Sequence, residues 1–297
     1  MPPQAGKLAL VTGGSGGVGF ATALALARAG ATVIVAARSE EKARQADNHL
    51  RAIWPAADVR VEALDLASLT SIEALAKRLI AQGQPIDLLV NNAGVMAPAE
   101  RKLTIDGFEL QLGTNHLGHF ALTGRLLPLL RRAPAPRVVT VSSIAHKRGR
   151  IDFDDLQSAR GYRPFQAYRQ SKLANLLFSF ELDRRSVAEQ WGIVSVAAHP
   201  GYARTELIAN GPQGRGPLKL MDLMLGPLLA QTAEQAARAS LYAATAPEVA
   251  RMGYYGPTGL GELFGPVGEA IIAPPARDEP VAQRLWAESV KLTGVSV

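Results

Sequence analysis

A glycine-rich segment near the amino terminus constrains the fold of this chain more than any other feature. Five of the eight residues of Thr12–Gly19 are glycine, and the segment joins an apolar run, Leu8–Thr12, to an amphipathic stretch, Val18–Ala29. Glycines permit a tight turn and bring backbone N–H groups close to a phosphate, and a helix N-terminus adds its positive dipole. A merely flexible loop would not need this position between a strand and a helix. The placement predicts a strand–turn–helix unit that binds a dinucleotide.

The first 200 residues alternate short apolar runs with longer amphipathic stretches. The short runs are rich in Val, Leu and Ile, as is typical of strands covered on both faces. Strand–helix alternation indicates parallel pairing with right-handed crossovers. We expect residues 1–297 to form a single-domain, Rossmann-type α/β fold: a doubly wound parallel sheet with helices on both faces. The predicted strands are Leu8–Thr12, Thr32–Ala36, Val59–Ala63, Asp87–Asn91, Arg137–Ser142 and Ile193–His199, and the predicted helices are Val18–Ala29, Glu40–Ile53, Ser68–Gln82, Gly107–Leu130 and Ala167–Gln190.

The composition excludes several classes of protein. The 297 residues include no cysteine, which rules out disulfides, thiolate zinc sites and a cysteine nucleophile and is typical of a reducing compartment. Met1–Lys7 contain no apolar stretch for a signal peptide, and no uncharged apolar run reaches the roughly 18 residues of a membrane span. We therefore expect a cytoplasmic protein without a membrane-spanning helix.

The charged residues indicate neither a nucleic acid partner nor a metal site. The net charge is +6, but the basic residues are scattered along the chain, as on a solvated surface. Among the five histidines, His116 and His119 are three residues apart, without the carboxylates that would complete a metal site. No metal is therefore predicted.

The end of the second predicted strand favours one form of the nicotinamide cofactor. NAD-binding proteins usually place Asp or Glu there to hold the ribose 2′-hydroxyl, whereas this chain has Ala37 and Arg38. The missing carboxylate removes repulsion of a 2′-phosphate, which a guanidinium can bind in a bidentate way. The pattern predicts NADP(H). The alternative is that Arg38 is only a surface residue opening the next loop.

Four polar residues have the types and positions expected of an active site. Tyr168 and Lys172 are four residues apart, so they share one helix face, and an ammonium beside a phenol is expected to lower its pKa. Ser143 follows the fifth predicted strand at the sheet edge where ligands bind, and its hydroxyl could bond a substrate oxygen. Asn115 lies within a predicted helix, where Asn is a poor helix former. Together they predict proton-transfer chemistry.

On these motifs the chain resembles the short-chain dehydrogenase/reductase family over nearly its whole length. The resemblance implies that Tyr168 is the general acid or base and that Lys172 lowers its pKa and holds the ribose hydroxyls. It also implies that Ser143, rather than the adjacent Ser142, polarises the substrate oxygen and that Asn115 holds a water of the proton relay. The motifs behind the resemblance are Thr12–Gly19, Asp65–Leu66, Asn91–Gly94, Asn115, Ser143, Tyr168 with Lys172, and Pro200–Gly201.

The same resemblance implies a set of cofactor contacts. Asp65 would meet the adenine edge, Asn92 would shape the adenosine-ribose side, and Thr205 would contact the nicotinamide carboxamide or the pyrophosphate. The implied cofactor-binding residues are Gly13, Ser15, Gly16, Gly17, Val18, Gly19, Arg38, Asp65, Leu66, Asn92, Ala93, Gly94, Tyr168, Lys172, Pro200, Gly201 and Thr205.

Within the family the chain is most similar to the retinol-dehydrogenase-like branch. The spacing of 25 residues from Ser143 to Tyr168 is typical of that branch. One departure is that no membrane anchor precedes the first predicted strand, unlike in several relatives that act on retinoids. The likeness rests on Ser143–His146, Ser171–Asn175, His199–Gly201, Gln231–Gln235, Gly253–Pro257 and Leu285–Ser289.

The residues from about 203 to 232 lie where the family places its substrate-covering segment, and residues from about 253 to 297 form a carboxy-terminal tail. Leu207–Ala230 is rich in Leu and Met, which indicates an apolar lid and a hydrophobic substrate. A core helix, a dimer contact and a membrane-surface patch are the alternatives for this segment.

The predicted function is an NADP(H)-dependent oxidoreductase that interconverts a hydrophobic alcohol and a carbonyl. A non-catalytic dinucleotide sensor is one alternative, although it would be expected to lack Tyr168, Lys172 or Ser143. An epimerase or dehydratase using the same Tyr/Lys pair is another. The sequence leaves open the substrate, the direction of reaction and whether the chain forms a homo-oligomer.

Overall fold

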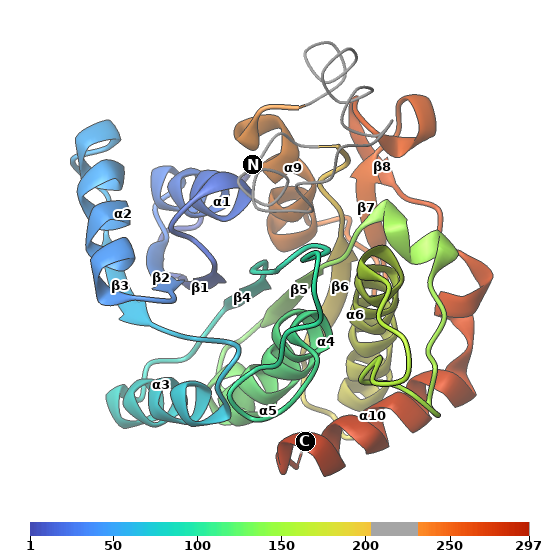
Figure 1. Ribbon diagram of the computed structural model, residues 1–297. Coiled ribbons are helices and arrows are strands. Elements are labelled where there is room, and N and C mark those ends of the chain that lie inside the picture. Colours follow the sequence, from blue (N-terminus) through green and yellow to red (C-terminus); the bar gives the residue numbers. More distant parts are fainter. Residues whose placement is uncertain (203–230, 297) are drawn as a thin grey trace.

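The computed structural model, which describes residues 1–202 and 231–296, is built on an eight-stranded sheet (Figure 1). The strand order is β3-β2-β1-β4-β5-β6-β7-β8, and all neighbouring pairs are parallel except β7 with β8. The predicted doubly wound sheet is confirmed, with an antiparallel edge strand added. The strands are β1 (Leu8–Thr12), β2 (Thr32–Ala37), β3 (Val59–Ala63), β4 (Leu88–Asn91), β5 (Arg137–Val141), β6 (Val194–Ala198), β7 (Tyr254–Pro257) and β8 (Val267–Glu269).

Helices cover both faces of the sheet, as Figure 1 shows. One face packs against α1 (Gly17–Arg28), α2 (Glu40–Ile53) and α9 (Ala233–Thr245). The other packs against α3 (Leu69–Gln82), α5 (Gly118–Leu130) and α6 (Pro164–Ala188), and α10 (Glu279–Thr293) lies along α6. Shorter segments are α4 (Leu110–Leu112), the π-helix η1 (Gly113–Leu117) and the 3₁₀ segments η2 (Ile144–Arg148), η3 (Leu260–Glu262) and η4 (Pro274–Arg277).

The two cores explain why the strands are continuously apolar. Successive side chains of a strand point to opposite faces. In β1, Leu8 and Leu10 join the core beneath α3 and α5, whereas Ala9 and Val11 join the core beneath α1 and α9. Since both faces are covered, a polar side chain pointing to either face of the sheet would be buried away from water.

The predicted helix Gly107–Leu130 is the clearest local error in the prediction. The helical segment begins at Leu110, and a π-helix, Gly113–Leu117, interrupts it around Asn115. At this interruption the Asn115 side chain exchanges two hydrogen bonds with the backbone of Val95, which is distant in sequence. Local periodicity contains no information about such a partner.

The sequence pattern predicts no regular element after residue 200, yet α9, β7, β8 and α10 lie there. Helix α9 begins with a capping box between Thr232 and Gln235, and α10 is capped by Asp278. Strand β7 is short and contains Gly256 and Pro257, a composition typical of a loop. It is a strand because it pairs with β6, which is remote in sequence. The predicted segment Leu207–Ala230 lies outside the described residues. None of the helices in residues 1–202 and 231–296 is long and apolar enough to cross a membrane.

Candidate active site

The topology brings the predicted motifs to one edge of the sheet. Strands β1, β4 and β5 are neighbours and parallel, and their carboxyl ends are Thr12, Asn91 and Val141. The glycine-rich turn, Asn92–Gly94 and Ser143 therefore leave the sheet side by side. This is the edge where open α/β sheets bind ligands.

The glycine-rich turn is held against the end of β4. The Thr12 hydroxyl accepts hydrogen bonds from the backbone N–H groups of Asn92 (2.9 Å) and Ala93 (3.0 Å). The Asn92 side-chain amide donates to the Thr12 carbonyl at 2.9 Å. A Cβ on Gly13 would lie 3.0 Å from Ala93, and one on Gly19 would clash with the Gly13 carbonyl oxygen. These glycines are therefore needed for the close approach of the turn to β4 and α1.

The start of α1 fits a phosphate group. Its N-cap, Gly16, provides no side-chain hydrogen bond within the described part of the chain, and its first turn contains no acidic residue. The first N–H groups of a helix have no intrahelical partner, and their dipole attracts anions. Ser15, Gly17 and Val18 are partly exposed beside this helix end. The turn fits the pyrophosphate of a dinucleotide.

The residues predicted to meet the adenosine end follow β2 and β3 at the same edge. Arg38 comes directly after β2 and is exposed. Asp65 is half-buried, and its carboxylate accepts the backbone N–H of Ala67 at 2.9 Å. Leu66 is buried, with its carbonyl oxygen packed against Gly118. Of the three side chains, Arg38 is exposed and Asp65 half-buried at this edge, whereas the Leu66 side chain joins the core.

Tyr168 and Lys172 lie one turn apart on α6, facing the end of β5. The Lys172 ammonium nitrogen is 5.8 Å from the centroid of the Tyr168 ring and donates to the Val141 carbonyl at 3.1 Å. The side chains of Tyr168 and Ser143 are hydrogen-bonded. The structure therefore brings Ser143, Tyr168 and Lys172 together, as their spacing and strand positions predict.

The pKa values of this group differ from the sequence expectation. Burial raises the pKa of Tyr168 to about 12, and the hydrogen bond with Ser143 offsets only part of that rise. Burial lowers the pKa of Lys172 to about 8. The pKa of Tyr168 is thus shifted in the direction opposite to the expected one, because burial disfavours the charged phenolate. Tyr168 is protonated at neutral pH and is suited to donating a proton.

The two adjacent serines have different environments. The Ser142 hydroxyl is buried and donates to the Lys172 carbonyl at 2.7 Å, which joins β5 to α6. Ser143 is half-buried and caps η2, with its hydroxyl oxygen accepting the Ala145 N–H at 3.2 Å. The geometry favours Ser143 for contact with a substrate oxygen.

Asn115 uses its whole side chain to hold the loop after β4. Its amide oxygen accepts the Val95 N–H at 2.8 Å, and its amide nitrogen donates to the Val95 carbonyl (3.0 Å) and the Ser171 hydroxyl (2.9 Å). A Cβ on Gly94 would lie 3.1 Å from the Asn115 amide oxygen and 3.6 Å from the Lys172 nitrogen. Gly94 therefore leaves room between these two side chains.

Pro200 and Gly201 are fixed by a residue to which the sequence assigned no role. The Gln231 side-chain amide donates to the carbonyls of Pro200 (2.7 Å) and Leu263 (3.0 Å). Gly201 has φ +70°, and a Cβ there would clash with the Leu263 carbonyl. Thr205 lies outside the described residues, so its predicted contact stays a prediction.

His146 is a second residue whose place the sequence did not reveal. Its Nδ1 lies 2.7 Å from the Ser143 carbonyl, to which it must donate, and its Nε2 accepts the Ala273 N–H at 3.3 Å. The ring is fully buried, and burial lowers its pKa. Its position three residues after Ser143 was a signal, but the partner Ala273 is remote in sequence.

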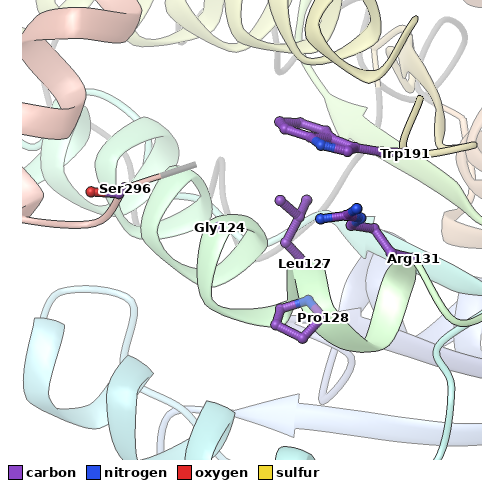
Figure 2. Close-up of a pocket in the computed structure, with 6 residues that line it drawn as sticks. All are labelled: Gly124, Leu127, Pro128, Arg131, Trp191 and Ser296. Atoms are coloured by element: carbon purple, nitrogen blue, oxygen red, sulfur yellow. The ribbon is translucent and has the colours of Figure 1, made fainter. Parts of the chain in front are cut away.

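A surface cavity of about 650 Å³ lies at the opposite edge of the sheet (Figure 2). It is formed where α5 ends before β5 and where the chain approaches β6. None of the predicted site residues contributes to it. The lining residues are Gly124, Leu127, Pro128, Arg131, Trp191 and Ser296.

Comparison with known sequences finds one family model and relatives that share nearly the whole chain. The family model described as short chain dehydrogenase matches residues 7–215. Retinol dehydrogenase 13 from Homo sapiens is 43% identical over 294 residues, which cover 98% of this chain and 85% of that protein. Polyprenol dehydrogenase from Mus musculus is 41% identical over 298 residues, which cover 99% of this chain and 86% of that protein. The similarity thus includes nearly the whole chain.

Solved structures share the fold. An uncharacterised protein from Mycobacterium paratuberculosis superposes with a TM-score of 0.82 at 40% identity, covering 100% of this chain and 96% of that one. The NADP active-site complex of Pseudomonas aeruginosa RhlG has a TM-score of 0.65 at 29% identity, covering 85% and 94%. A short chain dehydrogenase from Shigella flexneri, complexed with NADP, has a TM-score of 0.61 at 26% identity, covering 81% and 91%.

Proposed function

Because this chain belongs to the short-chain dehydrogenase/reductase family of oxidoreductases, and to its retinol-dehydrogenase-like branch, we propose that it interconverts a hydrophobic alcohol and its carbonyl with NADP(H). One observation supports this proposal above the others. Ser143, Tyr168 and Lys172 lie together at the end of β5, beside a glycine-rich turn that fits a pyrophosphate.

The residues that would hold the cofactor follow from their positions. N–H groups at the start of α1 would bind the pyrophosphate, with Gly13, Gly16 and Gly19 allowing its close approach. Arg38 would bind the 2′-phosphate, Asp65 the adenine edge and Lys172 the ribose hydroxyls. When bound, the nicotinamide would supply or accept the hydride. Pro200, Gly201 and Thr205 would border its carboxamide end.

The protein's own part in carbonyl reduction is proton donation and charge stabilisation. Tyr168 donates its phenolic proton to the substrate oxygen, and Ser143 donates a hydrogen bond to the same atom. Lys172 stabilises the phenolate that remains, and the Tyr168 oxygen would regain a proton from solvent through the relay water that Asn115, by its backbone carbonyl, would hold. In alcohol oxidation the Tyr168 oxygen accepts the proton instead.

The preference for NADP(H) rests on Arg38. Position 37, where a carboxylate would bind an NAD ribose, is alanine, and the exposed guanidinium beside it suits a phosphate. Two related structures, RhlG and the Shigella flexneri dehydrogenase, were solved with NADP. Both observations support the phosphorylated cofactor.

The hydrophobic substrate rests on the relatives and on one apolar segment. Relatives at 43% and 41% identity are named for retinol and polyprenol, both long apolar alcohols. Leu207–Ala230, which is rich in Leu and Met, occupies the sequence position of the substrate-covering segment. A long-chain or polyene aldehyde is therefore the substrate class to test first.

The first experiment titrates the purified protein with NADPH and NADH side by side at fixed salt, followed by assays with apolar aldehydes. We expect NADPH to bind at least about tenfold tighter, which is roughly 1.4 kcal/mol, and to support turnover. Tighter binding of NADH would overturn the role of Arg38 but keep the enzyme. Binding without turnover of any carbonyl or alcohol would favour the sensor alternative, and no binding at all would overturn the proposal.

Tyr168→Phe tests the chemistry separately from binding. Removing the phenolic oxygen deletes the proton donor while keeping the ring, so kcat should fall roughly 100-fold or more. The Kd of NADPH should change less than about threefold. Retention of more than a tenth of the wild-type kcat would show that another group donates the proton.

A further inference from the structure

His119 lies between three of the motifs that form the site. It is the second residue of α5, four residues after Asn115, and its side chain is fully buried. Its Nδ1 is 2.9 Å from the Asn115 backbone carbonyl oxygen, and its Nε2 is 2.9 Å from the Thr12 hydroxyl. Thr12 in turn accepts the N–H groups of Asn92 and Ala93. One imidazole thus connects the glycine-rich turn, the end of β4 and the π-helix.

The hydrogen bonds determine the tautomer of the ring. A carbonyl oxygen only accepts, so Nδ1 of His119 is the donor to Asn115. In the neutral ring Nε2 is then the acceptor, and the Thr12 hydroxyl donates to it. That assignment leaves the lone pairs of the Thr12 oxygen for Asn92 and Ala93. Burial lowers the pKa of His119 to about 4, so the neutral ring is the form present at neutral pH.

The assignment gives every polar atom of this group a partner of the right kind. The Thr12 hydroxyl has the Val90 carbonyl as a competing acceptor, but that oxygen is 3.3 Å away, against 2.9 Å for His119. The Asn115 carbonyl keeps a second lone pair, since a carbonyl oxygen accepts two hydrogen bonds. His119 therefore sets the orientation of both the Thr12 hydroxyl and the Asn115 peptide.

We propose that His119 is a positioning residue that fixes the cofactor-binding turn and the Asn115 carbonyl relative to each other, so that cofactor affinity and proton return depend on its two ring nitrogens separately. The inference rests on the proposed function, because it assigns Thr12–Gly19 to the cofactor and the Asn115 carbonyl to the proton relay. His119 itself is fully buried against Thr12 and Asn115, so we assign it no direct contact with substrate or cofactor.

Two substitutions separate the two ring nitrogens. His119→Asn places an amide nitrogen near the position of Nδ1, so it can still donate to Asn115 but does not reach Thr12. His119→Gln reaches toward Thr12 with an amide oxygen but loses the donor to Asn115. We expect His119→Asn to raise the Kd of NADPH roughly tenfold and to change kcat less than about threefold. His119→Gln should do the reverse, lowering kcat roughly tenfold with little change in Kd.

His116→Gln is the matched control. His116 is equally buried and only three residues away, but its Nε2 contacts the Ser289 hydroxyl of α10 at 2.9 Å, not the site. Thermal unfolding of all three variants measures any general loss of stability. If His119 were merely structural, its two variants would behave like His116→Gln, with a lowered unfolding temperature and unchanged Kd and kcat of the folded fraction.

A double-mutant cycle completes the test. Thr12→Val removes the hydroxyl, and Thr12→Ser keeps it. Thr12→Val alone should weaken NADPH binding severalfold, and if His119 acts through that hydroxyl, the combined effect of Thr12→Val and His119→Asn on Kd should be smaller than the product of the two single effects. Additive effects would overturn the inference, as would equal effects of the Asn and Gln variants on both Kd and kcat. Wild-type protein that binds no cofactor would overturn the proposed function, and the inference with it, whereas normal wild-type turnover with silent His119 variants overturns the inference alone.

Discussion

Burial gives Tyr168 and Lys172 opposite protonation properties, with pKa values of about 12 and about 8. Both shifts have the same cause, because a low-dielectric environment disfavours the charged form of either group. The phenol is thereby kept as an acid over the whole neutral range. The ammonium is left with a pKa close to the neutral range.

The pH dependence of carbonyl reduction should therefore report Lys172. We expect kcat/KM to be constant well below pH 8 and to fall as pH rises through about 8, since deprotonated Lys172 no longer carries the positive charge that stabilises the Tyr168 phenolate. Tyr168 does not titrate in this range. Rates measured from pH 6 to 10 with Lys172→Met as control should show a low, flat profile for the variant. A falling limb that persists in Lys172→Met would assign the titration to another group.

Arg38 should decide between the two cofactors. Arg38→Asp replaces a phosphate ligand with a carboxylate that can bind the ribose 2′-hydroxyl. The Kd of NADPH should rise at least about tenfold while that of NADH stays equal or falls. Arg131→Asp makes the same charge change at the opposite edge of the sheet, where Arg131 is exposed, and should leave the ratio of the two Kd values unchanged. An equal change in both variants would mean that overall charge, not Arg38, sets the preference.

Among individual residues, the sequence predicts the roles of those whose positions depend on their neighbours along the chain. Tyr168 and Lys172 share a helix face because of their spacing, and Ser143 follows a recognisable strand. His119, His146 and Gln231 were not assigned roles, since each contacts a segment that is remote in sequence: the Thr12 hydroxyl, the Ala273 N–H and the Pro200 carbonyl, respectively. The pKa of Tyr168 was predicted in the wrong direction because spacing does not reveal how deeply a pair is buried.

Among the elements, α10 is secured to the rest of the fold by Trp286. Its indole stacks on Phe178 of α6 (centroids 5.8 Å apart), meets Phe120 of α5 edge-on (5.0 Å) and lies beneath the Arg185 guanidinium (4.6 Å). The side chain is buried. A single residue thus joins three helices.

Trp286→Ala should cost about 3–5 kcal/mol in the free energy of unfolding, the usual range for deleting a buried aromatic side chain. Denaturant unfolding followed by circular dichroism measures the loss. Trp54→Ala is the control, because Trp54 is 40% exposed and its removal should cost much less. Equal losses in the two variants would show that α10 contributes little to stability.

The π-helix and the carboxy-terminal elements could not be predicted from the periodicity of the sequence. Gly113–Leu117 lies inside a longer run with helical periodicity, and the hydrogen bonds of the Asn115 side chain with Val95 are not visible in that pattern. Strand β7 contains Gly256 because a Cβ there would overlap the His199 ring. Both features depend on contacts across the fold, which periodicity does not encode.

For the whole molecule, the alternation of strands and helices was sufficient to predict the sheet and the edge that contains the site. The antiparallel strand β8 was not predicted, since three residues give no periodic signal. The cytoplasmic location stays a prediction.

One ion pair joins distant parts of the chain and should make stability depend on pH. Lys147 of η2 and Glu262 of η3 are 2.6 Å apart, and Glu262 also accepts the Ile271 N–H at 2.6 Å. Burial alone would raise the pKa of Glu262, but the hydrogen bonds from Lys147 and Ile271 outweigh it and hold that pKa below 4.5. A carboxyl with a lowered folded-state pKa stabilises the fold above its unfolded pKa, and that contribution is lost as pH falls through the folded value.

Glu262→Gln should therefore lower the free energy of unfolding by about 1–3 kcal/mol at pH 7. The difference from wild type should shrink as pH falls below 4.5, when Glu262 becomes protonated in both states. Urea unfolding at pH 7 and at several acidic values measures both quantities. A difference that is independent of pH would assign the loss to packing and not to charge.

The two outer strands of the sheet also determine how copies of this protein can meet. Within the described residues β3 pairs only with β2, and β8 only with β7. Strand β3 contains the charged Arg60 and Glu62, and β8 is three residues long with an exposed Glu269. Charged or very short edges are poor templates for a further strand. Fibril-like growth by strand addition at these two edges is thereby disfavoured.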